Sequence, residues 1–319
     1  MFIVSGSDVR RLIPMADAIA AMGDAFTSIV DGTADQPPRM VSSDGSALAM
    51  MARRTGLVGD RGTAFKLISV RQANRAQGLP TVQAVAIWFG AETGGPRLLI
   101  EGATLTSLRT GAASGLATDL LAAPDAATLA MIGAGGQAAD QIRAVTAVRK
   151  IRDIRIFSQS GESASRLVGS LQPELPETAI SRVESAAAAV ADADVVCCAT
   201  NSASPVITGE GLKDRVHINA IGSYLPTMCE LPDRLLGRAN LVVVDELKSA
   251  LAESGEIIAA LGSGSLVLSD LVELGDLIAV PRPPDGLTIF KSVGIALQDW
   301  AICQLLSERV PESASQAVL

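Results

Sequence analysis

The stretch that decides the fold is Ala127-Thr128-Leu129-Ala130-Met131-Ile132-Gly133-Ala134-Gly135-Gly136-Gln137-Ala138. An apolar run typical of a buried strand breaks into a glycine-rich turn, and a helical pattern follows over 139–148. Gly133, Gly135 and Ala138 have the spacing G-x-G-x-x-A, which binds a pyrophosphate where a strand turns into a helix. The helix N-terminus there favours negative charge. The sequence therefore predicts that a dinucleotide contacts residues 133–138.

The chain around this turn alternates between short apolar segments and helical segments. The expected strands are 127–132, 154–157, 193–199, 216–221 and 241–244, and the expected helices are 136–149, 162–171, 184–190 and 231–237. Alternating strands and helices are typical of a parallel sheet with helices on both faces. We therefore expect an α/β protein with a doubly wound parallel sheet of the Rossmann type over residues 121–289.

The chain before this region has a different pattern. Consecutive strands without intervening helices indicate an antiparallel or mixed sheet. The expected elements are a helix over 7–30, strands at 47–52, 63–70, 81–89 and 97–100, a helix over 106–121, and a last helix over 289–306. We expect the last helix to return to the first domain. The prediction is a discontinuous α+β domain, made of residues 1–120 and 290–319, that binds substrate and forms the dimer.

Composition excludes several classes of protein. The 319 residues exceed the size of a single core, and 48% hydrophobic and 19% charged residues indicate a well-buried globular protein. A formal net charge of −8 disfavours nucleic acid and anionic membranes as partners. No apolar run has the length of a membrane span, and the four cysteines lack metal-ligand spacing. We expect a cytoplasmic protein with inert thiols and no metal, and a structural role for His217.

The sequence does not decide which nicotinamide nucleotide binds. The second strand of the expected Rossmann sheet is followed by Ser158-Gln159-Ser160. An enzyme that uses NAD usually has an acidic residue there to bind the ribose 2′-hydroxyl, and none is present. The turn therefore permits a 2′-phosphate, with Ser158, Ser160 and Arg166 nearby, but it contains no arginine of its own. NADH and NADPH both remain possible.

Several segments together resemble one family of oxidoreductases, the ornithine cyclodeaminase/mu-crystallin family. The matching segments include residues 105–114, 133–138, 217–223, 253–257 and 289–294, so the resemblance covers nearly the whole chain. The pieces around Arg109-Thr110 and Phe290-Lys291-Ser292 are the most specific. The resemblance implies a homodimeric, nicotinamide-dependent enzyme of amino-acid metabolism. Its substrates carry a carboxylate beside a C–N bond.

The resemblance also implies roles for individual residues. Arg39, Lys66 and Arg109 match the cations that bind the substrate carboxylate, and Lys66 is the candidate proton donor and catalytic residue. Beyond the glycine turn, we expect cofactor contacts from Arg109, Thr110, Ser158, Gln159, Ser160, Thr200, Asn201, Ser223 and Ser292. Three acids match family positions without an assigned role, because each could also end a strand or face solvent: Asp245, Glu256 and Asp299.

One departure from the family narrows the reaction. Cyclodeaminases carry an aspartate where this chain has Tyr224, and a phenol does not replace a carboxylate at neutral pH. The sequence therefore predicts an NAD(P)H-dependent imine reductase that acts on Δ1-pyrroline-2-carboxylate, a cyclic ketimine or iminosuccinate. Three alternatives stay open. They are an alanine dehydrogenase-type amino-acid dehydrogenase, an ornithine cyclodeaminase, and a non-enzymatic NAD(P)H-binding protein like the lens crystallin.

Overall fold

The computed structural model describes residues 1–55, 61–280 and 285–310. The chain divides into two compact units, which are Met1–Arg109 with Ile295–Leu319, and Thr110–Gly294. The sequence placed these boundaries at 120/121 and 289/290. The second unit takes in more chain than that, because it includes the later part of one long helix and the last strand of its sheet. Residues 311–319 of the predicted substrate domain lie outside the described residues.

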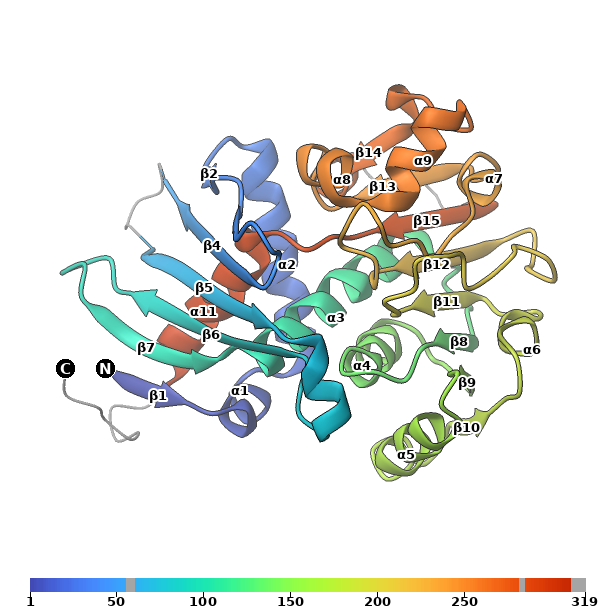
Figure 1. The fold of residues 1–319 in the computed structure, drawn as a ribbon, viewed down its shortest axis with the longest axis horizontal. Helices are drawn as coiled ribbons and strands as arrows, with labels where there is room; N and C mark the ends of the chain where they lie inside the picture. The colour runs from blue at the N-terminus through green and yellow to red at the C-terminus, as the bar shows by residue number, and fades with distance from the viewer. Residues whose placement is uncertain (56–60, 281–284, 311–319) are drawn as a thin grey trace. The chain divides into compact units, whose positions relative to one another are not determined.

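The first unit contains a seven-stranded sheet in the order β1-β7-β6-β5-β4-β2, with β3 paired to β4 (Figure 1). Strand β1 pairs with β7 in parallel, and the other pairs are antiparallel, so the sheet is mixed. The strands are β1 (Phe2–Val4), β2 (Ala34–Asp35), β3 (Met40–Val41), β4 (Ala47–Arg54), β5 (Thr63–Val70), β6 (Val82–Phe89) and β7 (Pro96–Glu101).

The helices of the first unit differ from the prediction at both ends of the chain. A single helix over 7–30 is wrong, because α1 (Gly6–Leu12) ends before Pro14 and α2 (Met15–Val30) begins after it. Proline disfavours helical backbone in the residue before it, and Ile13 is extended. The last helix, α11 (Ala296–Arg309), packs against α2, β4 and β5. Its predicted start at residue 289 is wrong, because residues 287–291 form a strand of the second unit.

Two further helices begin in this unit. The 3-10 helix η1 (Gln72–Gln77) follows β5, and α3 (Gly102–Leu121) begins after β7. Among the described residues, no single helix is long and apolar enough to cross a membrane. Helices α1 and α2 meet that criterion only together, as a pair bent by 85°.

The second unit is built on an eight-stranded sheet in the order β10-β9-β8-β11-β12-β15-β13-β14 (Figure 1). All its pairs are parallel, and the first five strands have the order 3-2-1-4-5 of dinucleotide-binding sheets. The predicted fold class is therefore confirmed. The strands are β8 (Thr128–Ile132), β9 (Asp153–Phe157), β10 (Ala179–Arg182), β11 (Val195–Cys198), β12 (Val216–Ala220), β13 (Leu241–Val244), β14 (Leu271–Glu273) and β15 (Leu287–Lys291).

Helices cover both faces of this sheet. They are the part of α3 from Thr110 onward, α4 (Ala138–Val148), α5 (Gly161–Leu171), α6 (Ala186–Val190), α7 (Asp233–Leu236), α8 (Leu247–Glu253), α9 (Gly255–Ser263) and α10 (Leu274–Ala279), with the 3-10 helix η2 (Leu268–Asp270). Successive side chains of each strand enter opposite cores. Ala130 and Ile132 join one buried cluster, whereas Leu129 and Met131 join the other. Two buried faces explain why the strands lack an alternating polar pattern.

Candidate active site

Two of the predicted substrate cations share one carboxylate in the first unit. Lys66 lies in β5, Arg109 in α3, and Asp299 in the first turn of α11. Lys66 Nζ lies 2.6 Å from Asp299 Oδ2, and Arg109 Nε lies 3.2 Å from Asp299 Oδ1. All three side chains are buried. Asp299 therefore does not face solvent on its helix but fixes the positions of both cations.

The electrostatics of this cluster set the protonation of Lys66. Burial lowers the pKa of Lys66 to about 8; the ion pair with Asp299 raises that pKa, and the charges of Arg109 and Arg39 lower it. Arg39 is half-buried, and its charge acts on Lys66, while Lys66 and Arg109 share the carboxylate of Asp299. Lys66 and Arg109 therefore place two positive charges against the one carboxylate of Asp299.

Gln298 belongs to the same cluster, and the sequence did not predict it. Its side-chain oxygen accepts hydrogen bonds from Arg109 Nη1 at 2.6 Å and from the backbone N–H of Ile295 at 3.2 Å. These two donors fix the orientation of the amide and help to hold Arg109. The available signal was a polar pair, Gln298 and Asp299, directly before the apolar run 300–303 of the same helix.

The glycine turn of the second unit has the geometry that the fingerprint predicts. Gly133 follows β8 with φ +106°, and a Cβ added there would lie 2.5 Å from the carbonyl oxygen of Ala199. A Cβ added at Gly135 or Gly136 would meet nothing within 4 Å. Ala138, fully buried, begins α4, whose N-terminus has no side-chain cap. The turn therefore presents an open backbone face beside the N-terminus of a helix.

The other predicted cofactor residues follow strands of the same sheet. Ser158 comes directly after β9, Thr200 and Asn201 come after β11, Ser223 after β12, and Ser292 after β15. Because these strands are parallel, their carboxyl ends meet at one edge of the sheet, where nucleotides bind. Thr110 lies in α3 and is buried. Gln159 and Ser160 are exposed, and the hydroxyl of Ser160 caps α5.

A buried glutamate, Glu230, joins the loops that follow β11 and β12. Glu230 Oε1 accepts from the backbone N–H of Thr200 at 2.6 Å and from its hydroxyl at 2.9 Å. Glu230 Oε2 accepts from the backbone N–H of Gly222 at 2.7 Å. Burial raises the pKa of Glu230, while Lys291 and these hydrogen bonds lower it. One carboxylate therefore sets the spacing of two loops at the nucleotide edge.

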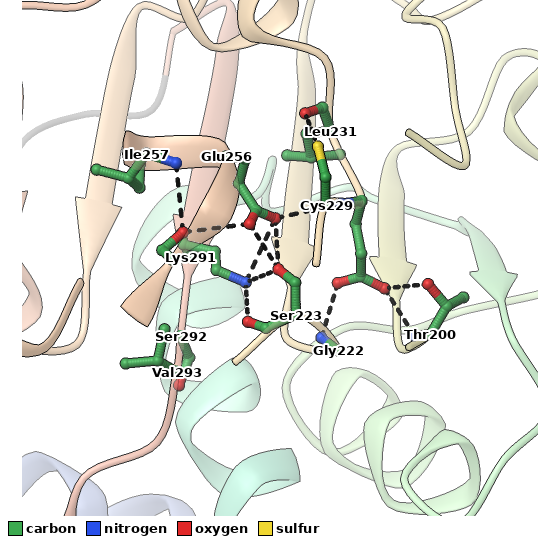
Figure 2. A network of polar contacts seen from close by, with 12 residues as sticks. Thr200, Gly222, Ser223, Cys229, Leu231, Glu256, Ile257, Lys291, Ser292 and Val293 are labelled. Carbon is green, nitrogen blue, oxygen red and sulfur yellow. Dashed lines mark hydrogen bonds and ion pairs between the residues drawn. The ribbon is translucent and has the colours of Figure 1, made fainter. Parts of the chain in front are cut away.

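Ser223 and Ser292 are held by charged groups that the sequence could not pair with them. The Ser223 hydroxyl lies 2.7 Å and 2.6 Å from the two oxygens of Glu256, and Lys291 Nζ donates to the Ser223 carbonyl at 2.6 Å (Figure 2). Glu256 and Lys291 are fully buried. The Ser292 hydroxyl donates to Asp245 at 2.8 Å. Both serine hydroxyls are thus engaged within the protein, and Glu256 and Asp245 do not face solvent.

Asp245 also binds the backbone that leaves the second unit. Its Oδ2 accepts from the N–H groups of Val293 at 2.9 Å and Gly294 at 2.7 Å. Gly294 has φ +81° and is the last residue of the unit. The carboxylate therefore fixes the backbone where the chain leaves the parallel sheet.

His217 lies inside the second unit, between Thr288 and Asn219. Its ring nitrogens lie 3.0 Å from the Thr288 hydroxyl and 3.1 Å from the Asn219 side-chain oxygen. Burial lowers the pKa of His217 to about 4, so the ring is neutral at physiological pH. Across the described ranges, no three or more His, Cys, Asp or Glu side chains are grouped to hold a metal ion.

Comparison with known proteins agrees with this geometry. A family model described as the ornithine cyclodeaminase/mu-crystallin family matches residues 2–314. A Δ1-pyrroline-2-carboxylate reductase of Bacillus cereus is 33% identical over 321 residues, which cover 98% of this chain and 97% of that protein.

Two solved structures are similar along their whole length. The Thermococcus litoralis Δ1-pyrroline-2-carboxylate reductase, in complex with NADH and L-proline, has a TM-score of 0.92 and 30% identity, covering 100% of both chains. An archaeal alanine dehydrogenase dimer with bound NAD has a TM-score of 0.86 and 31% identity, covering 97% of this chain and 95% of that one.

Proposed function

The chain belongs to the ornithine cyclodeaminase/mu-crystallin family, and from this premise we propose that it is an NAD(P)H-dependent reductase that converts an α-imino acid into the L-amino acid. The observation that carries the proposal is the buried cluster of Lys66, Arg109 and Asp299, in a chain whose second unit has a dinucleotide turn. The substrate class comprises Δ1-pyrroline-2-carboxylate, cyclic ketimines and iminosuccinate.

The residues of the second unit fit a dinucleotide. The space beside Gly135 and the N-terminus of α4, which no side chain caps, suit a pyrophosphate. We assign its binding to residues 133–138, and we assign further contacts to Arg109, Thr110, Ser158, Gln159, Ser160, Thr200, Asn201, Ser223 and Ser292. When bound, NAD(P)H supplies the hydride that reduces the C–N double bond.

The first unit would bind the substrate through its carboxylate. Guanidinium groups bind carboxylates in a fixed, planar geometry, and a buried site strengthens the attraction. Asp299 offsets only one of the two positive charges of Lys66 and Arg109, so an anionic substrate completes the charge balance. Gln298 and Asp299 hold Arg109 in place before substrate arrives, which reduces the cost of ordering it.

Lys66 has the protonation that a proton donor requires. With a pKa of about 8, its Nζ carries a proton at pH 7 and releases it more readily than an exposed lysine does. We assign to Lys66 Nζ the proton that the imine nitrogen gains when the substrate binds as a neutral imine. Tyr224 offers no carboxylate to activate an amine or a water, which supports reduction rather than cyclodeamination.

A substitution tests the role of Lys66. Lys66→Met should lower kcat by about 10²–10⁴-fold, the usual contribution of a general acid, while NAD(P)H binding stays unchanged. Lys213→Met is the matched control, because Lys213 forms a surface ion pair with Asp194 and should leave turnover intact. Unchanged turnover in Lys66→Met would contradict the assignment.

The reaction itself is tested by following the oxidation of NADH and of NADPH in parallel. The substrates are Δ1-pyrroline-2-carboxylate, iminosuccinate, and pyruvate with ammonia. Oxidation with a preformed imine and no ammonia is the expected result. Oxidation that requires a keto acid and ammonia would instead make the protein an amino-acid dehydrogenase. Nucleotide binding without any turnover would favour a binding protein.

We also propose a homodimer located in the cytoplasm. The structurally similar archaeal alanine dehydrogenase is a dimer, which supports the first point. The four cysteines are free, as expected in a reducing compartment, which supports the second. Light scattering after size-exclusion chromatography should give twice the mass of one chain, and a monomeric mass would refute the dimer.

A further inference from the structure

The carboxyl end of β9 is the place where the protein can distinguish NADPH from NADH. In a dinucleotide-binding sheet, the adenosine ribose lies after the second strand, which here is β9. The turn that follows, Ser158-Gln159-Ser160, contains no carboxylate to accept from a ribose 2′-hydroxyl. It also contains no cation. A selecting residue therefore has to come from another part of the chain.

Arg182 supplies a cation at this place. It is the last residue of β10, which pairs in parallel with β9, and it lies opposite Ile156 near the end of that strand. A Cβ added at Gly161 would lie 2.9 Å from both Cζ and Nη1 of Arg182 and 3.2 Å from its Nη2. The guanidinium therefore lies directly beside the first residue after the Ser158–Ser160 turn. The absence of a side chain at Gly161 gives it this room.

The partner of Arg182 can be replaced. Arg182 Nη2 donates to both carboxylate oxygens of Glu184, at 2.8 Å and 3.1 Å. The Glu184 side chain is 85% exposed and that of Arg182 is 41% exposed, and such surface pairs contribute little stability. A phosphate monoester carries more charge than a carboxylate and offers three acceptor oxygens. It can therefore compete with Glu184 for the guanidinium.

We propose that Arg182 binds the 2′-phosphate of NADPH and makes this protein prefer NADPH over NADH. The inference rests on the proposed function and names the nucleotide of the same site. A planar guanidinium that binds two phosphate oxygens distinguishes NADPH from NADH, because the ribose 2′-hydroxyl of NADH carries no charge. The carboxylate of Glu184 is paired with Arg182 in the free protein and is the group that the 2′-phosphate displaces.

Isothermal titration calorimetry on the full chain, without any imino acid, tests the proposal. The titrants are NADPH, NADH and 2′,5′-ADP. The wild type should bind NADPH at least about tenfold more tightly than NADH. Arg182→Gln should weaken NADPH and 2′,5′-ADP about ten- to a hundredfold and change NADH less than about twofold.

Arg234→Gln is the matched control. Arg234 is exposed in α7 of the same unit and donates to the Thr208 carbonyl at 3.4 Å, so the substitution removes an equal charge from a residue with no assigned nucleotide contact. It should leave the NADPH/NADH ratio unchanged. Equal binding of the two nucleotides by the wild type would overturn the inference but not the proposed function. An NADH preference that Glu184→Gln abolishes would also overturn it. Binding of neither nucleotide would overturn both.

Discussion

Asp299→Asn removes the one carboxylate between Lys66 and Arg109 and keeps the shape of the side chain. In the wild type, the pKa of Lys66 is about 8 instead of 10.5. At about 1.4 kcal/mol per pKa unit, holding this buried ammonium at pH 7 costs about 3 kcal/mol of folding free energy. The charge of Asp299 raises the pKa of Lys66, so that pKa falls when the charge is removed.

The loss of stability in this variant has an upper limit. Once the pKa of Lys66 falls below 7, the folded protein releases the proton at pH 7, which limits the total cost to about 5 kcal/mol. Lys66 therefore adds at most about 2 kcal/mol to the loss, and the weaker hydrogen bond of Arg109 adds about 1 kcal/mol. A lysine whose pKa is lowered in the folded protein destabilises the fold most at pH values below that pKa. This loss of folding free energy declines as the pH rises towards 10.5. At pH 9 both proteins hold a neutral Lys66, and only the Arg109 contribution remains.

We therefore expect Asp299→Asn to lower the free energy of unfolding by about 2–3 kcal/mol at pH 7 and by about 1 kcal/mol at pH 9. Urea unfolding followed by tryptophan fluorescence measures this, because Trp88 and Trp300 are both buried in the first unit. Asp17→Asn is the control, since Asp17 forms a partly exposed ion pair with Arg309 and should lose about 0–1 kcal/mol at both pH values. An equal deficit at pH 7 and pH 9, or no deficit, would refute the reasoning.

Three further predictions concern the second unit. Glu230→Gln replaces one acceptor oxygen by an NH2 group that faces a backbone N–H. The melting temperature should therefore fall, and the Kd of NAD(P)H should rise at least about tenfold. Unchanged binding in calorimetry would exclude a positioning role for Glu230. Gly133→Ala should lower the free energy of unfolding by about 2 kcal/mol or more, because Gly133 has φ +106° and the added Cβ meets the Ala199 carbonyl. Gly135→Ala should keep the wild-type stability but bind the nucleotide more weakly. Two variants that behave alike in denaturation and titration would contradict this distinction. The pKa of His217 is lowered from 6.5 to about 4, so the unfolded chain takes up a proton that the folded one does not, and stability should fall by about 2 kcal/mol between pH 7 and pH 5. His217→Gln should show a smaller fall in the same urea titrations, and an equal fall would rule out this cause.

The architecture of the second unit was largely predictable, because its turn chemistry and its hydrophobic pattern agree. Gly133 and Ala138 place the strand-to-helix turn, and the short apolar runs after it are parallel strands. Strands β10, β14 and β15 were not predicted. The five buried residues of β15 run towards an apolar helix. Periodicity does not separate a short buried strand from a buried helical turn.

The candidate site was predictable in its cations but not in their partners. Lys66 was conspicuous as a charge inside an apolar strand. Its ion pair with Asp299 joins β5 to α11 near the other end of the chain. The contact between Arg182 and Gly161 likewise depends on β10 lying beside β9. Such pairings follow from tertiary packing, and no local spacing in the sequence encodes them.

The position of β15 has a consequence for how the protein is made. This strand lies between β12 and β13, yet it follows all the other described strands along the chain. The nascent chain can assemble β8 to β12 early, but the edge of β12 then waits for residues 287–291. An uncovered apolar strand edge is a site of aggregation during synthesis. Until residues 287–291 have been synthesised, the edge of β12 is therefore the part of this sheet that most needs protection from other strands.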